Sequence, residues 1–313
     1  MTMQGAEAVL VAALVCVIVA LVGQLVALTS RRQTAPAAPA LKRAATVGAA
    51  VIESGGDLSA AGPDGLATPS PRPAPTGPAG LGVAGLATAL TVIAAVLLSV
   101  YLGWRVALTG HGPFANQHEF AVAFAWSILV AGLIALRRFR LPVLTVVVLP
   151  VVACLLLYAL RLDTAVAPLV PALQNNLLLS LHVGFAVLSY GAACVSFGGA
   201  VVYLLHPKLK LTTPRERFDA IGYQAAVVAF PLMTMMIVLG ALWAETAWGR
   251  FWGWDPKETA ALVTWLIYAG FLHARLARGW RGTKSAVLLV VGFAAVLFVY
   301  LGNSFLGGLH AYA

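Results

Sequence analysis

Charged side chains are scarce in this sequence. Only 10% of its 313 residues are Asp, Glu, Lys or Arg, whereas 61% are hydrophobic, and the mean hydropathy is +0.91. A water-soluble protein of this length needs more charge to cover its surface, whereas a chain surrounded by lipid does not. The composition therefore excludes an ordinary soluble domain and indicates a membrane protein.

Cysteine is also scarce, and its arrangement excludes two kinds of chemistry. The three cysteines, Cys16, Cys154 and Cys194, each lie within an apolar run, and none belongs to a C-x-x-C or C-x-x-C-H pattern. The chain is therefore neither a dithiol oxidoreductase nor a protein with covalently attached haem. We interpret the three cysteines as packing residues.

Long apolar runs, by contrast, are abundant. A membrane-spanning helix needs about 20 mostly apolar residues. By that rule the sequence predicts an all-α membrane helix bundle with about eight spans, at roughly 8–28, 81–102, 119–136, 141–160, 178–205, 219–243, 257–277 and 285–304. The first run lacks a basic N-terminal flank and is followed by Arg31 and Arg32, so we expect residues 1–29 to form an uncleaved span with its N-terminus outside the cytoplasm.

Residues 30–80 differ from the rest of the chain. Eight of the seventeen prolines lie there, among Ala, Gly, Ser and Thr. Such a composition cannot bury a core, so we predict a disordered cytoplasmic linker, followed by one membrane domain over residues 81–313.

The net charge of +9 raises the question of nucleic-acid binding. The basic residues lie between the apolar runs rather than along one face, so we interpret them as topology signals and expect no nucleic-acid partner. With eight spans, sixteen of the twenty face the cytoplasm and both chain ends lie outside. The four exceptions are Arg105, Arg161, Arg250 and Lys257.

Tryptophan is concentrated in one predicted outer loop, within residues 243–259. Four of the eight tryptophans lie there: Trp243, Trp248, Trp252 and Trp254. An interfacial aromatic belt is the plain alternative, but belt residues scatter among helix ends. Glycines let this loop turn so that its rings form a surface suited to a flat apolar ring system, while Arg250 and Lys257 offer cations to its carboxylates.

Asp255 has a structural interpretation as well. Asp255, Pro256 and Glu258 together form the pattern of a capped helix start, with Asp255 at the N-cap. Such a cap would fix where the seventh span begins and hold the aromatic loop at the membrane surface.

Two histidines are predicted on the same face as this loop. His182 begins the fifth span and His310 follows the eighth. Imidazole is a common axial ligand of haem iron, so the pair predicts a bis-His site, although either residue alone fits an interfacial position. His273 lies about 20 Å deeper along the seventh span, toward the cytoplasm. A polar group there suggests function, with an interfacial residue as the alternative. His111 and His118 lie in an outer loop and remain unassigned.

These residues support a resemblance to a known family. The segment WGRFWGWDPKET (248–259) resembles the tryptophan-rich WWD signature of haem-handling proteins in cytochrome c biogenesis. The chain is most similar to the CcsA/ResC type of system II, called CcsB in some bacteria. Further similarity lies in GHGPFANQHEFAVAFAW (110–126), LHVGFAVLSY (181–190), WLIYAGFLHARL (265–276) and GNSFLGGLHAYA (302–313), and the whole covers roughly residues 81–313. Phe251 departs from the usual Tyr or Trp but keeps the ring.

The resemblance implies a function. His182 and His310 match the external haem-ligating histidines, and His273 matches a transmembrane histidine thought to hold haem on its way from the cytoplasmic side. The expected protein is a plasma-membrane subunit of a holocytochrome c synthase that receives haem b as a bound substrate. It would act with a ResB-type partner on apocytochrome c, and thioredoxin-like proteins would supply the reduced thiols. Two alternatives stay open: CcmC-like transfer of haem to a periplasmic chaperone, and a non-catalytic membrane scaffold.

Overall fold

The protein is a bundle of long helices. A computed structural model describes residues 3–33, 82–164 and 176–310, and every regular element in these ranges is a helix. The elements are α1 (Met3–Gln33), α3 (Val83–Thr109), α4 (Gln117–Phe139), α5 (Val143–Ala159), α6 (Asn176–Leu209), α7 (Arg215–Trp248), α8 (Pro256–Ala277), α9 (Thr283–Leu301) and the short α10 (Asn303–Leu306). The predicted all-α membrane bundle is thereby confirmed.

Seven of these helices are long and apolar enough to cross a membrane. The remaining predicted span, the fourth along the chain at 141–160, forms α5, which has 17 residues and lies at the lower end of the length that spans a bilayer. Helix α1 continues to Gln33, so the first residues of the predicted linker are helical, and the linker's remainder at 34–80 lies outside the described residues.

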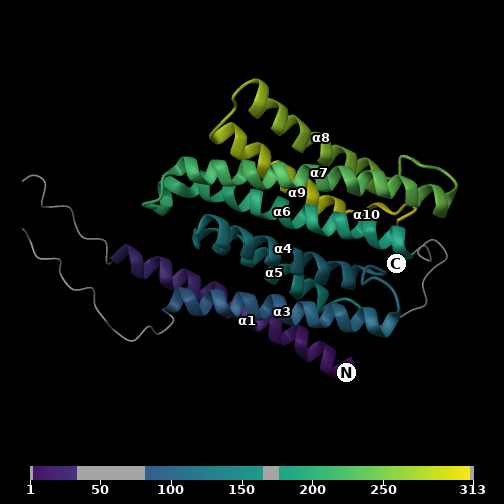
Figure 1. Cartoon of the computed structure of the whole chain (residues 1–313), viewed down its shortest axis with the longest axis horizontal. Helices are drawn as coiled ribbons and strands as arrows, with labels where there is room; N and C mark the ends of the chain where they lie inside the picture. The colour runs from purple at the N-terminus through teal and green to yellow at the C-terminus, as the bar shows by residue number, and fades with distance from the viewer. Residues whose placement is uncertain (1–2, 34–81, 165–175, 311–313) are drawn as a thin grey trace, which may run out of the picture.

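Figure 1 shows how the crossings alternate. The start of α1, the α7–α8 loop and α10 lie at one end of the bundle, on the right of the view, which we call the site end. The α4–α5, α6–α7 and α8–α9 turns lie at the opposite end, together with most of the basic residues. Both ends of the described chain therefore lie on one side, as an even number of crossings requires.

Helix α6 is the centre of the bundle, because it packs against α4, α5, α7 and α9. Small residues let it approach its neighbours closely. A Cβ on Gly199 would lie 2.8 Å from the backbone nitrogen of Gly222 on α7, and one on Gly191 would lie 2.7 Å from the carbonyl oxygen of Ser127 on α4. Close backbone approach of this kind is how helices gain packing energy in lipid, where the solvent is itself apolar.

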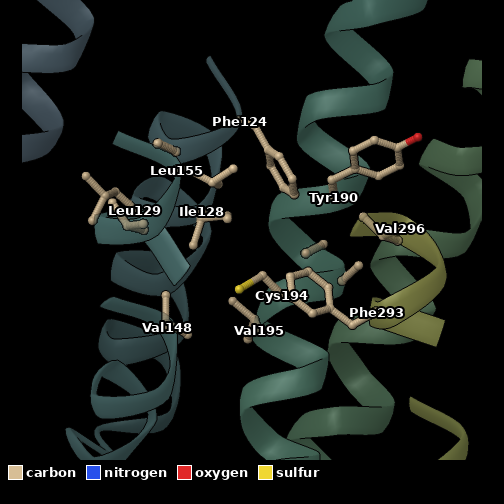
Figure 2. Close-up of a cluster of buried hydrophobic side chains, with 14 of the residues drawn as sticks. Phe124, Ile128, Leu129, Val148, Leu155, Tyr190, Cys194, Val195, Phe293 and Val296 are labelled. Carbon is tan, nitrogen blue, oxygen red and sulfur yellow. The ribbon is translucent and has the colours of Figure 1, made fainter. Parts of the chain in front are cut away.

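Apolar side chains fill the layer between α4–α5 and α6–α9. Figure 2 shows Phe124 and Ile128 on one side of this layer and Cys194 and Val195 on the other, and all four are buried. The Tyr190 ring closes the top of the cluster, and its hydroxyl points away from Phe124. This layer of the core is therefore mainly apolar, and buried polar side chains such as Arg105 and Glu119 lie elsewhere in the bundle.

One buried polar contact joins α3 to α4 at the site end. The Arg105 guanidinium and the Glu119 carboxylate form an ion pair at 2.5 Å in which both side chains are 1% exposed. Glu119 also accepts the Ala115 N–H, and Arg105 donates to the Thr164 carbonyl. A buried pair holds its partners in place because either charge alone would be costly. Arg105, predicted as an outer topology charge, is thus a structural residue.

Candidate functional site

The site is built around the loop between α7 and α8. Helix α7 ends at Trp248, where Gly249 takes a left-handed conformation with φ of 71° and donates its N–H to the Glu245 carbonyl. Helix α8 begins at Pro256 with the predicted capping box: the Asp255 carboxylate accepts the Lys257 N–H at 3.1 Å, and the Glu258 carboxylate accepts the Asp255 N–H at 3.1 Å. The predicted N-cap is confirmed, and it fixes the point at which the loop joins the membrane helix.

The same Asp255 carboxylate binds the end of the described chain. It accepts the Leu309 N–H at 2.6 Å on Oδ1 and the His310 Nδ1–H at 2.8 Å on Oδ2. Gly308 makes the approach possible, because its φ of 103° is unfavourable for other residues and a Cβ there would collide with Asp255 Oδ1. The residues after α9 are in this way brought back over the start of α8.

His310 and Asp255 form a neutral–anionic pair. Burial lowers the pKa of His310, so its imidazole is neutral near neutral pH. Burial alone would raise the pKa of Asp255, but the hydrogen bonds from His310 and from the Leu309 N–H outweigh it and lower that pKa, so the carboxylate is ionised. A carboxylate can only accept, which places the imidazole proton on Nδ1 and the lone pair on Nε2.

His182 on α6 is held in the same way by a different acceptor. Its Nδ1 lies 2.8 Å from the carbonyl oxygen of Met236 on α7, which only accepts, so Nδ1 carries the proton and Nε2 the lone pair. One turn further along α7, Gly240 provides the space for the ring: a Cβ there would lie 2.6 Å from His182 Cε1. The imidazole therefore lies directly on the backbone of α7.

Trp243 contacts both histidines. Trp243 is 2% exposed. Its ring is nearly parallel to that of His182, with an interplanar angle of 3° and 6.2 Å between ring centroids, and its centroid lies 5.7 Å from that of His310. Trp248 contacts both Trp243 and His310 edge-on, with ring centroids 4.7 Å and 4.9 Å apart, respectively. The two imidazoles, predicted to share a face of the membrane, thus belong to one aromatic cluster.

This cluster borders a cavity of about 970 Å³, a volume that includes the open space at its mouth. Its walls are mostly apolar and come from α4, α6, α7, α8 and α9, together with the α3–α4 and α7–α8 loops. Its polar members include His182, His310, Lys257, Glu258 and Tyr190. Ligand-binding sites are typically apolar pockets with a few convergent polar groups, so this cavity is the candidate binding site.

The predicted loop residues take different positions. Trp252 lines the cavity, whereas Trp254 is 69% exposed and contacts Trp252 edge-on. Lys257 also lines the cavity, with Nζ 5.9 Å from the centre of the Phe120 ring, while Arg250 is exposed. Among the described residues no carboxylate lies within ion-pair distance of Lys257. The loop was expected to form one aromatic surface with two cations, Arg250 and Lys257. In the structure only Lys257 lines the cavity, whereas Arg250 and Trp254 are exposed.

The remaining histidines lie elsewhere. His273 is exposed near the end of α8 opposite the site, about 20 Å along the helix from Thr259. His118 is buried, with Nε2 bound to the Tyr101 hydroxyl and Nδ1 to the Ala159 carbonyl, so it joins α3, α4 and α5. His111 contacts the Gly112 carbonyl in the α3–α4 loop. Both histidines were predicted in an outer loop, but His118 lies in the first turn of α4; neither is part of the cavity wall.

Several cavity residues were not among the predicted site residues. Trp243 was noted only as a neighbour of the loop, and Tyr190, Phe120, Tyr300 and Gly240 were not assigned. A partial signal for Tyr190 exists, because Val183, Ala186 and Tyr190 repeat at helical spacing beside His182 and all line the cavity. The others come from α4, α7 and α9, and only the packing of these helices brings them together.

Fold and site define a multi-pass helical membrane protein with a histidine-flanked aromatic cavity at one end. Comparison with known proteins gives the family. Residues 115–310, which include the whole site, match the family described as "Cytochrome C assembly protein". The chain belongs to this family, and its relatives place it with the CcsA-type proteins of system II cytochrome c biogenesis, as the sequence resemblance predicted.

Three such relatives bear the name "Cytochrome c biogenesis protein CcsA". The chain is 34% identical to that of Guillardia theta over 252 residues, which cover 71% of this chain and 83% of the relative. It is 33% identical to that of Prochlorococcus marinus (strain AS9601) over 260 residues, with the same coverage. It is 36% identical to that of Microcystis aeruginosa (strain NIES-843 / IAM M-2473) over 293 residues, which cover 74% of this chain and 87% of the relative.

Gly240 gives a test of the site geometry. In Gly240→Ala the new methyl group must displace the His182 ring from α7, and a misplacement of about 1 Å at a functional group can cost about 100-fold in rate. We expect cytochrome c assembly in cells to fall at least about tenfold. Gly270→Ala on α8 is the matched control, because no atom lies within 4 Å of its new Cβ. Equal activity of both variants, at equal protein level, would show that the position of His182 does not matter.

Proposed function

We propose that this protein holds haem in the cavity at the site end and presents it for covalent attachment to apocytochrome c. The observation that carries the proposal is the matched state of two imidazoles: His182 and His310 both border one cavity, and each has its Nδ1 committed to an oxygen acceptor. Their Nε2 atoms are the ones with a lone pair, which is the form in which histidine binds iron.

The cavity wall suits a haem substrate in other respects. A porphyrin is flat and apolar and carries two propionate groups. Trp243, Trp252 and Phe120 supply ring surface, and Lys257 supplies a cation inside the cavity for one propionate. Arg250, exposed on the loop, is placed for a group that extends toward solvent. A scaffold with only an interfacial belt gives no reason for two anchored imidazoles in one cavity.

The attachment reaction needs little from this chain beyond binding and orientation. Each apocytochrome cysteine adds its S–H across a haem vinyl group, so a C–S bond and a C–H bond form and no electrons are exchanged. The thiols must be reduced beforehand. Cys16, Cys154 and Cys194 form no disulfide within the described residues, which is compatible with thiol reduction by separate thioredoxin-like proteins.

The distribution of basic residues supports an outward orientation of the cavity. Most of them lie at the end of the bundle opposite the site, and basic segments favour the cytoplasmic side. The cavity would then face outward from the plasma membrane. His273, near the cytoplasmic end of α8 and exposed, would receive haem there, with a second ligand from a ResB-type partner packed against α8. CcmC-like transfer to a chaperone is the competing function, and a ResB-like reading frame beside the gene favours synthase activity over it.

The two histidines provide the main test. His182→Ala or His310→Ala should weaken haem retention and abolish holocytochrome c formation, because each removes one axial ligand. Added imidazole should restore part of the function by filling the vacant position. His111→Ala, a histidine at the same end of the bundle outside the cavity wall, should keep the wild-type absorption spectrum. Normal bis-His spectra and full activity in both His182→Ala and His310→Ala would rule out the ligand assignment.

The positions of two tryptophans predict unequal effects. Trp252→Ala should weaken haem binding by about 1–3 kcal/mol, by analogy with bases stacked on aromatic side chains, because the ring lines the cavity. Trp254→Ala should have a smaller effect, because that ring is 69% exposed and outside the cavity wall. Haem dissociation from the purified variants measures both. A larger loss for Trp254→Ala would mean that the outer edge of the loop, not the cavity, contacts haem.

His273 tests the route of haem. His273→Ala should lower the haem content of the complex while leaving the outer site able to bind added haem, because the two sites lie near opposite ends of the bundle. Leu276→Ala, at another exposed position in the last turn of α8, controls for loss of packing against a partner. The readout is haem per complex, with protein level measured in parallel. A stable, fully haem-loaded and active His273→Ala protein would leave His273 as an interfacial residue only.

A further inference from the structure

The end of the described chain depends on few contacts. After α9 the chain forms one short turn, α10, in which Phe305 is 85% and Leu306 51% exposed, so this turn buries little apolar surface. Residues Leu309 and His310 are then bound to the Asp255 carboxylate, and the His310 ring also contacts Trp243 and Trp248. His182, by contrast, lies within the 34-residue α6 and against the backbone of α7.

Asp255 therefore has more partners than a helix cap requires. Capping of α8 uses the hydrogen bond from the Lys257 N–H, and Ser, Thr or Asn satisfies such a bond about as well as Asp. The bonds from the Leu309 N–H and the His310 Nδ1–H are additional, and both reach Asp255 from more than 50 positions away along the chain. A carboxylate can accept hydrogen bonds on both of its oxygens, whereas the side chains of Asn and Ser have only one oxygen each.

We infer that Asp255 is a positioning residue for His310, which it orients and keeps in the tautomer with the lone pair on Nε2. This inference rests on the proposed function, because it concerns His310 as an iron ligand. A carboxylate that accepts Nδ1–H fixes the ring of a metal-binding histidine and makes its other nitrogen more basic. Asp255 thus acts on haem through His310 rather than by contact with haem.

Asp255→Asn keeps a residue that can cap a helix but changes the acceptors. One of its two terminal atoms is now an NH₂ donor, and its oxygen caps α8 only where it replaces Oδ2, which accepts both the Lys257 N–H and the His310 Nδ1–H. If that donor faces His310, the ring must accept at Nδ1 and carry its proton on Nε2, which cannot then bind iron; the wrong histidine tautomer is a known consequence of such a change in serine proteases. If it faces Leu309 instead, the backbone that carries His310 loses its acceptor. Either arrangement weakens the ligand.

The experiment measures haem dissociation from the full-length chain into an excess of a high-affinity haem acceptor, together with the absorption spectrum. Asp255→Asn and Asp255→Ser should each release haem about 10- to 100-fold faster than wild type and lose low-spin bis-His character. Asn116→Ala, which removes the N-cap of α4 at the same end of the bundle, should release haem within about twofold of the wild-type rate.

A double variant separates positioning from general damage. If Asp255 acts only through His310, Asp255→Asn combined with His310→Ala should release haem no faster than His310→Ala alone. Release at the product of the two separate effects, or an unchanged spectrum and rate in Asp255→Asn, would overturn the inference. Wild-type protein without any bis-His spectrum would instead refute the proposed function itself, so the two failures can be told apart.

Discussion

Hydrogen bonds donated by two imidazole Nδ1 atoms determine the chemistry of the site end. His182 donates to the backbone carbonyl of Met236 on α7, and His310 donates to the Asp255 carboxylate at the start of α8. Because neither acceptor can donate, both rings have the same tautomer, with the lone pair on Nε2. The remaining features of the site either bring these rings to one cavity or keep them there.

The bundle supplies the necessary rigidity through close backbone packing and a few buried polar contacts. Gly199 and Gly222 let α6 and α7 approach, and Gly240 leaves room for the His182 ring at the same interface. The Arg105–Glu119 pair joins α3 to α4, and it holds the loop that carries Ala115 at the cavity wall. In lipid such contacts matter because water is not available to replace a lost partner. The loosely packed residues after α9 are the exception, and Asp255 holds them.

Much of the fold could be predicted from local patterns. Apolar runs predicted the seven long helices and the short α5. In lipid a spanning segment must hydrogen-bond its own backbone groups, so a long apolar run in the sequence indicates a helix. The D-P-x-E pattern predicted the N-cap of α8, because capping involves neighbours within three residues. Topology brought His182 and His310 to the same face, since only the number of crossings was needed for that conclusion.

The finer arrangement of the site depends on packing between distant segments. The contact between Asp255 and His310 joins residues 55 positions apart, and nothing near Asp255 in the sequence distinguishes a cap that also binds a histidine. Trp243 and Trp254 look equivalent in the sequence, yet Trp243 is buried in contact with both imidazoles and Trp254 is largely exposed. Arg105 resembles a loop charge until Glu119 is found beside it. Such distinctions need the relative positions of helices, which local patterns do not contain.

An experimental density map of the full chain, purified with the haem it carries, tests the central claim most directly. The account predicts planar density inside the cavity beside Trp243, joined on its two faces to the Nε2 atoms of His182 and His310. Haem density outside this cavity, or iron bound by any other residue while both imidazoles remain unligated, would contradict it.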